Sequence, residues 1–298
     1  MNRVGLIAKR GLQEASDVLT DLAAWLDARG VEPVFEADTA RLATSAEGRR
    51  TVSRDELPRA SDLIVALGGD GTLIGVAGRI AESGRDVPIL GVNFGSLGFL
   101  TEITLPELYD ALDATLAGRA TLEPRSMLSA RTLRGDAPFA DHIVLNDIVI
   151  TKAALSRIIE ISITVGDAPV TQFRADGLII ASPTGSTAYN LAAGGPIVHP
   201  AVDAMVLTPI APHTLTNRPV VIDGASEVHV RPVMADQDEV FVTFDGQSGF
   251  PLRPGDRVSV RRAPRPVRIV KSPHRTYFDV LREKLRWGAD NPVPRTRD

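Results

Sequence analysis

The sequence predicts an N-terminal α/β domain with a mainly parallel sheet and a C-terminal all-β domain. Up to about residue 120, short apolar runs alternate with stretches of helical periodicity, which is typical of a parallel sheet covered by helices on both faces. Beyond that point apolar residues recur at every second position, and turn residues separate the runs. A chain of 298 residues is long for one hydrophobic core and suits two domains.

Strands and helices are expected to alternate in the N-terminal part. The first helix has Leu19, Leu22, Ala23 and Leu26 at helical spacing, and Gly30 ends it. Strands are expected at residues 4–8, 31–35, 62–66 and 87–93, helices at 12–29, 73–83 and 105–118, a loop with a short helix at 38–60, and a second glycine-rich loop at 95–101.

Clean alternation indicates the strands of the C-terminal part, and together they predict an antiparallel β-sandwich. The closing residues 277–287 predict a helix with Phe278, Leu281 and Leu285 on one face, and the proline-rich residues 291–298 are expected to be loose. The alternating runs are Ile159/Ile161/Ile163/Val165, Val228/Val230, Val240/Val242/Phe244, Val258/Val260 and Val267/Ile269.

Composition narrows the function classes. The formal net charge of −4 argues against a nucleic-acid binder driven by bulk charge. The absence of cysteine excludes disulfides, thiolate catalysis and cysteine-ligated zinc, and nothing arranges the five histidines as metal ligands. No stretch approaches the ~18 apolar residues of a membrane helix, and the N-terminal apolar run is too short for a signal peptide. We therefore expect a cytoplasmic protein without a nucleic-acid or membrane partner.

A glycine-rich turn between the expected strand at 62–66 and the expected helix at 73–83 is the central motif. At the carboxyl end of a parallel sheet such a turn lies where ligands bind, and glycine lets a phosphate approach bare N–H groups. Asp70 could hold a metal or accept a proton from a substrate hydroxyl. The structural alternative is a plain turn in which Asp70 caps the helix. The motif reads Leu67-Gly68-Gly69-Asp70-Gly71-Thr72.

Three further stretches contain polar residues in apolar surroundings. Asn146-Asp147 splits an apolar run, which indicates either a strand end or bulge, or an amide and a carboxylate for sugar hydroxyls. Residues 182–196 give a hydroxyl-rich turn, a short helix and a Gly-Gly-Pro break, suited to a phosphate or ribose; a mere helix cap is the alternative. Asp245-Gly246-Gln247 by itself indicates a hairpin turn.

Taken together, these stretches resemble the NAD kinase family over nearly the whole chain. The glycine motif alone is shared with diacylglycerol-type lipid kinases and, more loosely, phosphofructokinases, whereas the run from Asp176 to Pro196 is more specific. The matching pieces, in order, are Gly68-Gly69-Asp70-Gly71-Thr72, Asn146-Asp147, Asp176-Gly177-Leu178, Pro183-Thr184-Gly185-Ser186-Thr187-Ala188-Tyr189, Gly194-Gly195-Pro196, Asn217-Arg218-Pro219, Asp245-Gly246-Gln247 and the closing segment 281–288.

The resemblance implies a domain of residues 1–119 plus 273–298, an NAD-binding β domain of residues 120–272, and a site in the crevice between them. It implies homodimers or homotetramers in which a neighbouring subunit can complete the site. The implied reaction transfers the terminal phosphate of ATP, or of polyphosphate, to the 2′-hydroxyl of the adenosine ribose of NAD, giving NADP. Mg²⁺ is expected on the donor phosphates, and no protein side chain is assigned as its ligand.

By the same resemblance, Asp70 is the catalytic base, and Gly68, Gly69, Gly71 and Thr72 approach phosphates. Asn146 and Asp147 hold NAD sugar and base groups, and Asp176 reaches the nicotinamide side. The remaining expected NAD contacts are Thr187, Ala188, Tyr189, Asn190, Leu191, Ala192, Ala211 and Gln247, with Arg157 and Arg174 as phosphate contacts.

Two positions depart from the family pattern. Asp147 stands where members often have Glu, which shortens the side chain by one methylene. Gly75 stands where many have Arg, which leaves that charge to another residue such as Arg79. The alternatives that remain are a diacylglycerol-type lipid kinase and a non-catalytic dinucleotide sensor.

Overall fold

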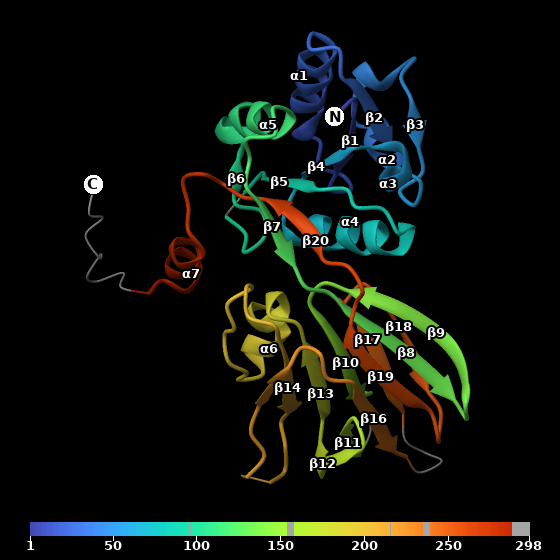
Figure 1. Cartoon of the computed structure of the whole chain (residues 1–298). Coiled ribbons are helices and arrows are strands. Elements are labelled where there is room, and N and C mark those ends of the chain that lie inside the picture. Colours follow the sequence, from blue (N-terminus) through green and yellow to red (C-terminus); the bar gives the residue numbers. More distant parts are fainter. Residues whose placement is uncertain (96, 154–157, 215, 235–238, 288–298) are drawn as a thin grey trace. The chain divides into compact units, whose positions relative to one another are not determined.

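The computed structural model describes residues 1–95, 97–153, 158–214, 216–234 and 239–287. The chain forms two compact units, one of Met1–Glu123 with Arg268–Asp298 and the other of Pro124–Val267 (Figure 1). Within the described part of the chain, no helix is long and apolar enough to cross a membrane.

The first unit is built on an eight-stranded sheet whose main path runs β3-β2-β1-β4-β5-β20-β7, with β6 paired to β5. The strand pairs from β3 across to β20 are parallel. The strands are β1 (Arg3–Ala8), β2 (Glu32–Glu36), β3 (Thr51–Val52), β4 (Leu63–Leu67), β5 (Ile89–Asn93), β6 (Ile103–Thr104), β7 (Leu122–Arg125) and β20 (Val267–Val270); the helices are α1 (Ala15–Asp27), α2 (Ala37–Ala40), α3 (Leu57–Ala60), α4 (Asp70–Ser83), α5 (Leu108–Leu116) and α7 (Tyr277–Leu285).

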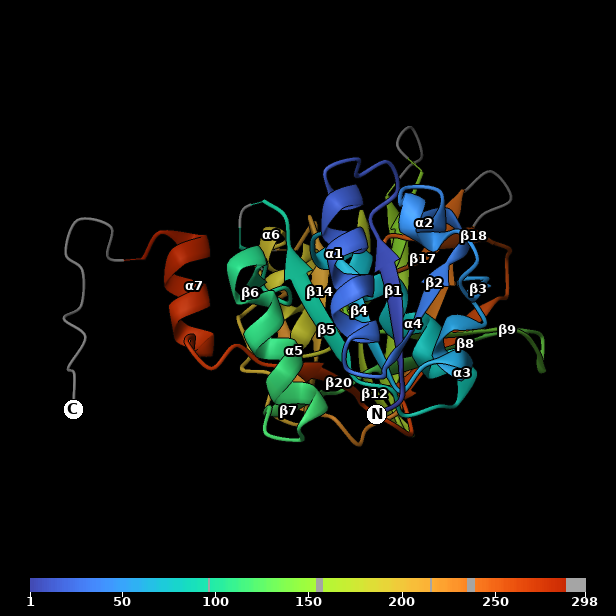
Figure 2. The same ribbon diagram turned by 90° about the horizontal axis from the view of Figure 1, so that it is seen from above.

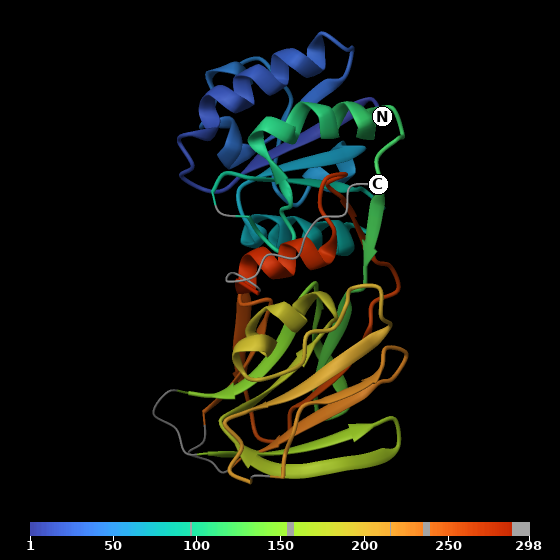
Figure 3. The ribbon, with the colours of Figure 1, turned by 90° about the vertical axis from the view of Figure 1, so that its left-hand side faces the viewer.

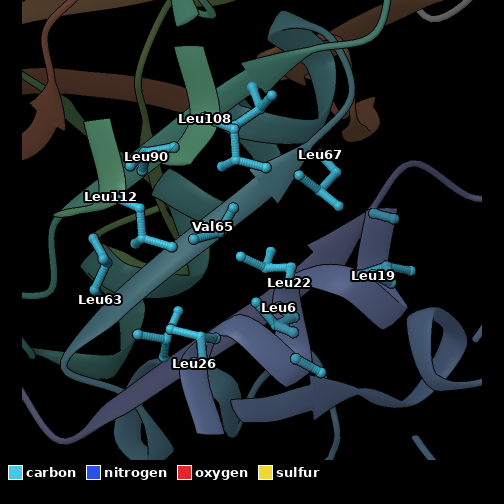
Figure 4. Close-up of a cluster of buried hydrophobic side chains, with 14 of the residues drawn as sticks. Leu6, Leu19, Leu22, Leu26, Leu63, Val65, Leu67, Leu90, Leu108 and Leu112 are labelled. Carbon is cyan, nitrogen blue, oxygen red and sulfur yellow. The ribbon is translucent and has the colours of Figure 1, made fainter. Parts of the chain in front are cut away.

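Helices cover both faces of this sheet. Figure 2 shows α1 and α5 lying over the strands, and Figure 3 shows α4 on the opposite face. The leucines of α1 and α5 pack with those of β1, β4 and β5 in one fully buried cluster (Figure 4). Each side chain removed from water in this way contributes about 1.5–3 kcal/mol before entropy is counted. The parallel α/β layer predicted from the alternation of elements is confirmed.

Two expected helix starts differ from the observed ones. The first helix begins at Ala15 rather than residue 12, because Gly11 adopts a positive φ of 72° and turns the chain before it. The helix after the glycine motif begins at Asp70 rather than residue 73, so the motif itself forms its first turn. In α7 the buried residues are Tyr277, Val280 and Leu281, whereas Phe278, expected on the same face as Leu281, is exposed.

The second unit consists of two six-stranded sheets, with orders β15-β14-β13-β10-β17-β18 and β12-β11-β16-β19-β8-β9. Alternate residues of both sheets enter one apolar cluster, which is the arrangement of a β-sandwich. The elements are β8 (Leu128–Arg134), β9 (Ala137–Val144), β10 (Asp147–Lys152), β11 (Ile159–Val165), β12 (Ala168–Ala175), β13 (Gly177–Ala181), α6 (Tyr189–Ala192), β14 (Ala204–Ile210), β15 (Val220–Asp223), β16 (Val228–Val233), β17 (Val240–Phe244), β18 (Ser248–Leu252) and β19 (Arg257–Arg262).

One strand belongs to a different sheet from the one expected. The Val267/Ile269 alternation correctly predicts a strand, but β20 pairs with β5 in the parallel sheet, with Ile269 opposite Ile89. Alternation reports a strand with a buried face and carries no information on the partner strand.

Candidate active site

The glycine motif forms a sharp connection from β4 to α4. Gly68 adopts a φ of 153°, and a Cβ at this position would lie 2.7 Å from Oγ1 of Thr72. Gly69 occupies the N-cap position of α4, where no side chain caps the helix. A phosphate at this helix end would meet the positive end of the helix dipole.

Asp70 does not cap its own helix, as the structural alternative supposed. Its carboxylate reaches the second glycine-rich loop, where Oδ2 accepts a hydrogen bond from the N–H of Phe99 at 2.8 Å. Oδ1 accepts bonds from the N–H groups of Leu100 and Thr101 and from Oγ1 of Thr101, all at 3.0–3.1 Å. Because each carboxylate oxygen offers two lone pairs, Oδ2 keeps one acceptor position for a further donor such as a substrate hydroxyl.

Gly98 permits this contact, and sequence reasoning did not place it in the site. A Cβ on Gly98 would lie 2.0 Å from Oδ1 of Asp70, a distance that no structure tolerates. The signal was present as the second glycine-rich loop at residues 95–101, but nothing in the pattern paired that loop with Asp70.

In the second unit, three of the predicted motifs meet at one end of a sheet. Asp147 begins β10, Ala181 ends β13 and pairs with it, and Phe244 ends β17 beside Ile148. The three motifs therefore lie next to one another at this end of the sheet. Asn146-Asp147 is at the start of β10, the hydroxyl-rich turn follows β13, and the Asp245-Gly246-Gln247 turn follows β17. The strand-end interpretation of Asn146-Asp147 is correct as to position.

Asp245 fixes this end of the sheet, and it is a residue that sequence reasoning assigned only to a turn. With φ values of 51° and 63°, Asp245 and Gly246 form the hairpin turn that the pattern indicated. The carboxylate of Asp245 accepts hydrogen bonds from the N–H groups of Leu145, Asn146 and Asp147 at 2.7–3.1 Å.

Asp147 has the opposite environment. Its side chain is only 5% exposed, and among the described residues no donor bonds to its carboxylate. Burial, together with the nearby charge of Asp245, raises the pKa of Asp147 to about 7. Burial also raises the pKa of Asp245, although its three N–H donors oppose this. A buried carboxylate with a strongly raised pKa and no protein donor is a candidate for ligand binding.

The hydroxyl-rich turn uses most of its polar groups on itself. Ser182 Oγ donates to the carbonyl of Leu145, and Ser186 Oγ donates to those of Pro183 and Val198. Asn190 is fully buried. Its side-chain amide donates hydrogen bonds to the carbonyls of Ser186 and Pro196 and accepts one from Oγ1 of Thr208. The predicted contacts that remain accessible here are Thr187, Ala188, Leu191 and Ala192, partly or fully exposed, and Tyr189, which is 47% exposed.

A second group of predicted residues lies at the other end of the same sheet. Asp176 precedes β13, and Ala211 follows β14 in a strained conformation with φ 44°. Asp176 lies five residues before Ala181, the last residue of β13, a length of roughly 17 Å at about 3.4 Å per residue. Asp176 faces Lys152 at 3.7 Å, and Arg174, at the end of β12, is exposed. Gln247 is exposed at the first end, while Arg157 lies outside the described residues.

The described residues form no metal-binding group, and Arg79 is paired elsewhere and does not replace the cation absent at Gly75. Among the described residues, no group of three or more histidine, aspartate or glutamate side chains is placed to hold a metal ion. Arg79, suggested as a substitute for the cation absent at Gly75, is engaged with Asp55 at 3.1 Å and Glu82 at 2.8 Å.

Comparison with known proteins decides the family. The family model "ATP-NAD kinase N-terminal domain" matches residues 4–120, and "ATP-NAD kinase C-terminal domain" matches residues 145–272. The chain belongs to the NAD kinase family. It is 47% identical to the NAD kinase of Geotalea daltonii and 48% identical to that of Geobacter sulfurreducens, each over 97% of this chain and 99% of the relative.

Solved structures of the family share the fold. A crystal structure of yeast NADH kinase complexed with NADH matches all of this chain and 90% of its own, with a TM-score of 0.86 at 22% identity. An NAD kinase from Archaeoglobus fulgidus in complex with ATP matches 94% of this chain and 99% of its own, with a TM-score of 0.75 at 24% identity. NAD kinases are enzymes that phosphorylate NAD, so the expected activity is confirmed over the lipid kinase and the sensor.

We expect Asp147→Asn to stabilise the protein in a pH-dependent way. The raised pKa means that the folded state binds this proton more tightly than the unfolded state, so stability falls as pH rises from about 4 to about 7. Above that range the ionised acid costs on the order of a few kcal/mol, which the amide avoids. Thermal unfolding at pH 5 and pH 8 should show a rise in Tm that is larger at pH 8.

Asp141→Asn is the matched control, because Asp141 pairs with Arg131 on the surface of the same unit. An exposed pair of this kind is worth about 0–1 kcal/mol, so Tm should change little at either pH. An Asp147→Asn protein whose stability advantage is absent or equal at both pH values would contradict the assignment of a buried, raised-pKa acid.

Proposed function

We propose that this NAD kinase transfers the terminal phosphate of ATP, or of polyphosphate, to the 2′-hydroxyl of the adenosine ribose of NAD. The observation that carries the proposal is Asp70, held by the residue 99–101 loop with one acceptor position left on Oδ2. The structural relatives bound to NADH and to ATP support a dinucleotide acceptor and a nucleotide donor. A cytoplasmic location is part of the same proposal.

In this mechanism Asp70 orients the attacking hydroxyl by accepting its hydrogen bond. Phosphoryl transfer passes through a loose transition state that needs little activation of the nucleophile, so orientation and charge neutralisation supply most of the barrier reduction. The fixed loop donors keep the carboxylate from rotating away. The released proton passes to Asp70 or to solvent as the new ester bond forms and the bond to the leaving diphosphate breaks.

Mg²⁺ fits this proposal as an ion carried on the donor phosphates. Mg²⁺ keeps several waters and is usually bound through one or two carboxylates and substrate phosphates. Asp70 is the acid of the glycine motif, but three of its four lone-pair positions are taken by the loop. Oxygens of the donor phosphates and water would therefore hold most of the ion, and the bound metal would neutralise charge on the transferred group.

NAD binding in the second unit is assigned to the strand ends that meet at Asp147. The carboxyl group of Asp147, with a pKa of about 7, can donate or accept a hydrogen bond at neutral pH and suits the polar edge of a base. Asn146, beside it, has no hydrogen bond from its side-chain amide among the described residues. The exposed ring of Tyr189 offers an aromatic face for a base.

A second copy of the chain is proposed to supply the other predicted group. Asp176 and Ala211 lie at the end of the sheet opposite to Asp147, separated from it by β13. Residues at opposite ends of one sheet can contact the same ligand when two copies of the chain are related by a two-fold axis. Asp176 and Ala211 of each copy then contribute to the ligand site of the other copy. A homodimer, or a homotetramer made of two such pairs, satisfies this requirement.

The activity is tested with the purified chain, Mg²⁺ and ATP, given either NAD or diacylglycerol vesicles. We expect NADP to form and no lipid to be phosphorylated. Enzymatic cycling specific for NADP measures the first product, and thin-layer chromatography measures the second. Lipid phosphorylation without NADP would overturn the proposal, as would binding of NAD with no turnover.

Asp70→Asn should retain NAD binding and lose most of kcat, by about 10²–10⁴-fold, the range of a positioned acid–base group. The amide also replaces one acceptor by a donor facing the N–H groups of the loop, so a control must separate orientation from loop loosening. Thr101→Val removes only the hydroxyl bond to Oδ1 and should cost less than about tenfold.

Calorimetric NAD affinity and steady-state kinetics on both variants give the comparison. If Asp70→Asn turned over like the unmodified protein, the role of Asp70 would be wrong. Equal losses in Asp70→Asn and Thr101→Val would assign Asp70 a purely structural role.

Mixed assemblies test whether a second copy contributes Asp176. Asp70→Asn and Asp176→Ala chains with different affinity tags are co-expressed, and hybrids are isolated on both tags in turn. If each site takes Asp70 from one copy and Asp176 from the other, a hybrid dimer keeps one intact site of two and about half the activity. Hybrids as inactive as both parents, or an active monomer by light scattering, would place Asp176 in the site of its own copy.

A further inference from the structure

The order of strands in the first unit identifies a ligand position independently of any motif. In the order β3-β2-β1-β4-β5, the chain passes from β1 to β2 on one side and later to β4 on the other. The strand order therefore reverses between β1 and β4. In open parallel sheets ligands bind outside the carboxyl ends of the strands at such a reversal.

A pocket of about 330 Å³ lies at this point, within the range of about 300–1,000 Å³ usual for ligand pockets. It is formed by the carboxyl end of β1, the glycine motif and Arg54. Its described lining contains three cationic side chains and no acidic or aromatic one: Ala8, Lys9, Arg10, Arg54, Gly69, Gly71 and Thr72.

The three cations are held in different ways. The Nε of Arg54 is buried without a hydrogen-bond acceptor and lies 3.6 Å from Glu36, whose carboxylate is itself bonded to Thr39. Arg10 is exposed and pairs with Asp38 at 3.0 Å. Lys9 is exposed and has no ion pair with any described residue, while its N–H binds the carbonyl of Leu67 and ties the end of β1 to that of β4.

We propose that this pocket binds the phosphate chain of the phosphate donor through Lys9, Arg10 and Arg54. The inference rests on the proposed function and extends it, because it assigns three cationic side chains of this chain to the donor site. Arg54 lines the pocket, and its guanidinium has a single ion pair among the described residues, a long contact of 3.6 Å with Glu36. Lys9 supplies a positive charge that no described acid neutralises.

The lining also specifies the chemical class of the ligand. Charged side chains, a hydroxyl and glycine backbone can hold phosphate oxygens, whereas none of the lining residues offers an aromatic or extended apolar surface for a base. The ligand recognised by this pocket is therefore a linear chain of phosphates, whether it is the tail of a nucleoside triphosphate or an inorganic polyphosphate.

The experiment measures binding of inorganic tripolyphosphate and of ATP to the whole protein by calorimetry, without NAD. The variants are Lys9→Gln and Arg54→Gln. Each removes one charged donor and should weaken tripolyphosphate binding about tenfold or more, with a parallel rise in the KM for ATP and little change in NAD affinity. Arg79→Gln is the charge-matched control, since Arg79 is engaged with Asp55 and Glu82, and it should bind tripolyphosphate as the unmodified protein does.

Unchanged tripolyphosphate affinity in Lys9→Gln would overturn the assignment, and this variant is informative even if Arg54→Gln unfolds through loss of its contact with Glu36. An equal loss in Arg79→Gln would overturn it as well, because bulk charge would then explain the effect. Binding of ATP without binding of tripolyphosphate would show that the nucleoside is required. NADP formation by the unmodified protein is scored separately, so failure of the donor pocket is distinguished from failure of the proposed function.

Discussion

Two aspartates each accept hydrogen bonds from three successive backbone N–H groups of a segment distant in the sequence. Asp70 holds residues 99–101, and Asp245 holds residues 145–147. The N–H groups of residues 99–101 lie in a connection, and those of residues 145–147 lie at the start of β10, where the carboxylate of Asp245 satisfies them. A buried N–H left unpaired costs about 1–3 kcal/mol. One carboxylate therefore fixes the course of a whole loop, and the position of every neighbouring polar group depends on it.

Local elements follow from the sequence because their causes are local. Apolar runs of β-branched residues produce β4 and β5, alternation produces the strands of the sandwich, and the leucines of α1 repeat at helical spacing. The sheet to which β20 belongs could not be predicted, because Val267 and Ile269 alternate equally well in either unit. The contact between Asp70 and the loop of residues 99–101 could not be predicted either, because a hydrogen bond between residues about thirty positions apart produces no periodic pattern in the sequence.

The candidate site shows the same division. The glycine motif and the Asn146-Asp147 strand end lie where the pattern predicts them, and for the hydroxyl-rich turn the pattern favours ligand contact because small polar residues suit phosphates. Several of these hydroxyls are used internally instead, as Ser182 and Ser186 tie the turn to Leu145 and Val198. Asn190 joins the same network. A dense run of small polar residues thus indicates a turn whose own side chains supply the hydrogen bonds that strand pairing does not. It does not indicate which groups the turn presents to a ligand.

Asp70 in the first unit and Asp147 in the second have opposite surroundings. Asp70 is surrounded by donors that hold it in one orientation, which suits a group that must align a hydroxyl repeatedly with the same geometry. Asp147 is buried near Asp245 and no described residue donates to its carboxylate, so its charge destabilises the fold. An asparagine there would remove that cost. The presence of an acid at this position is explained by a ligand that forms hydrogen bonds with the Asp147 carboxyl group. The hydrogen bonds of Asp245 to residues 145–147 then hold that carboxyl group in place for the ligand.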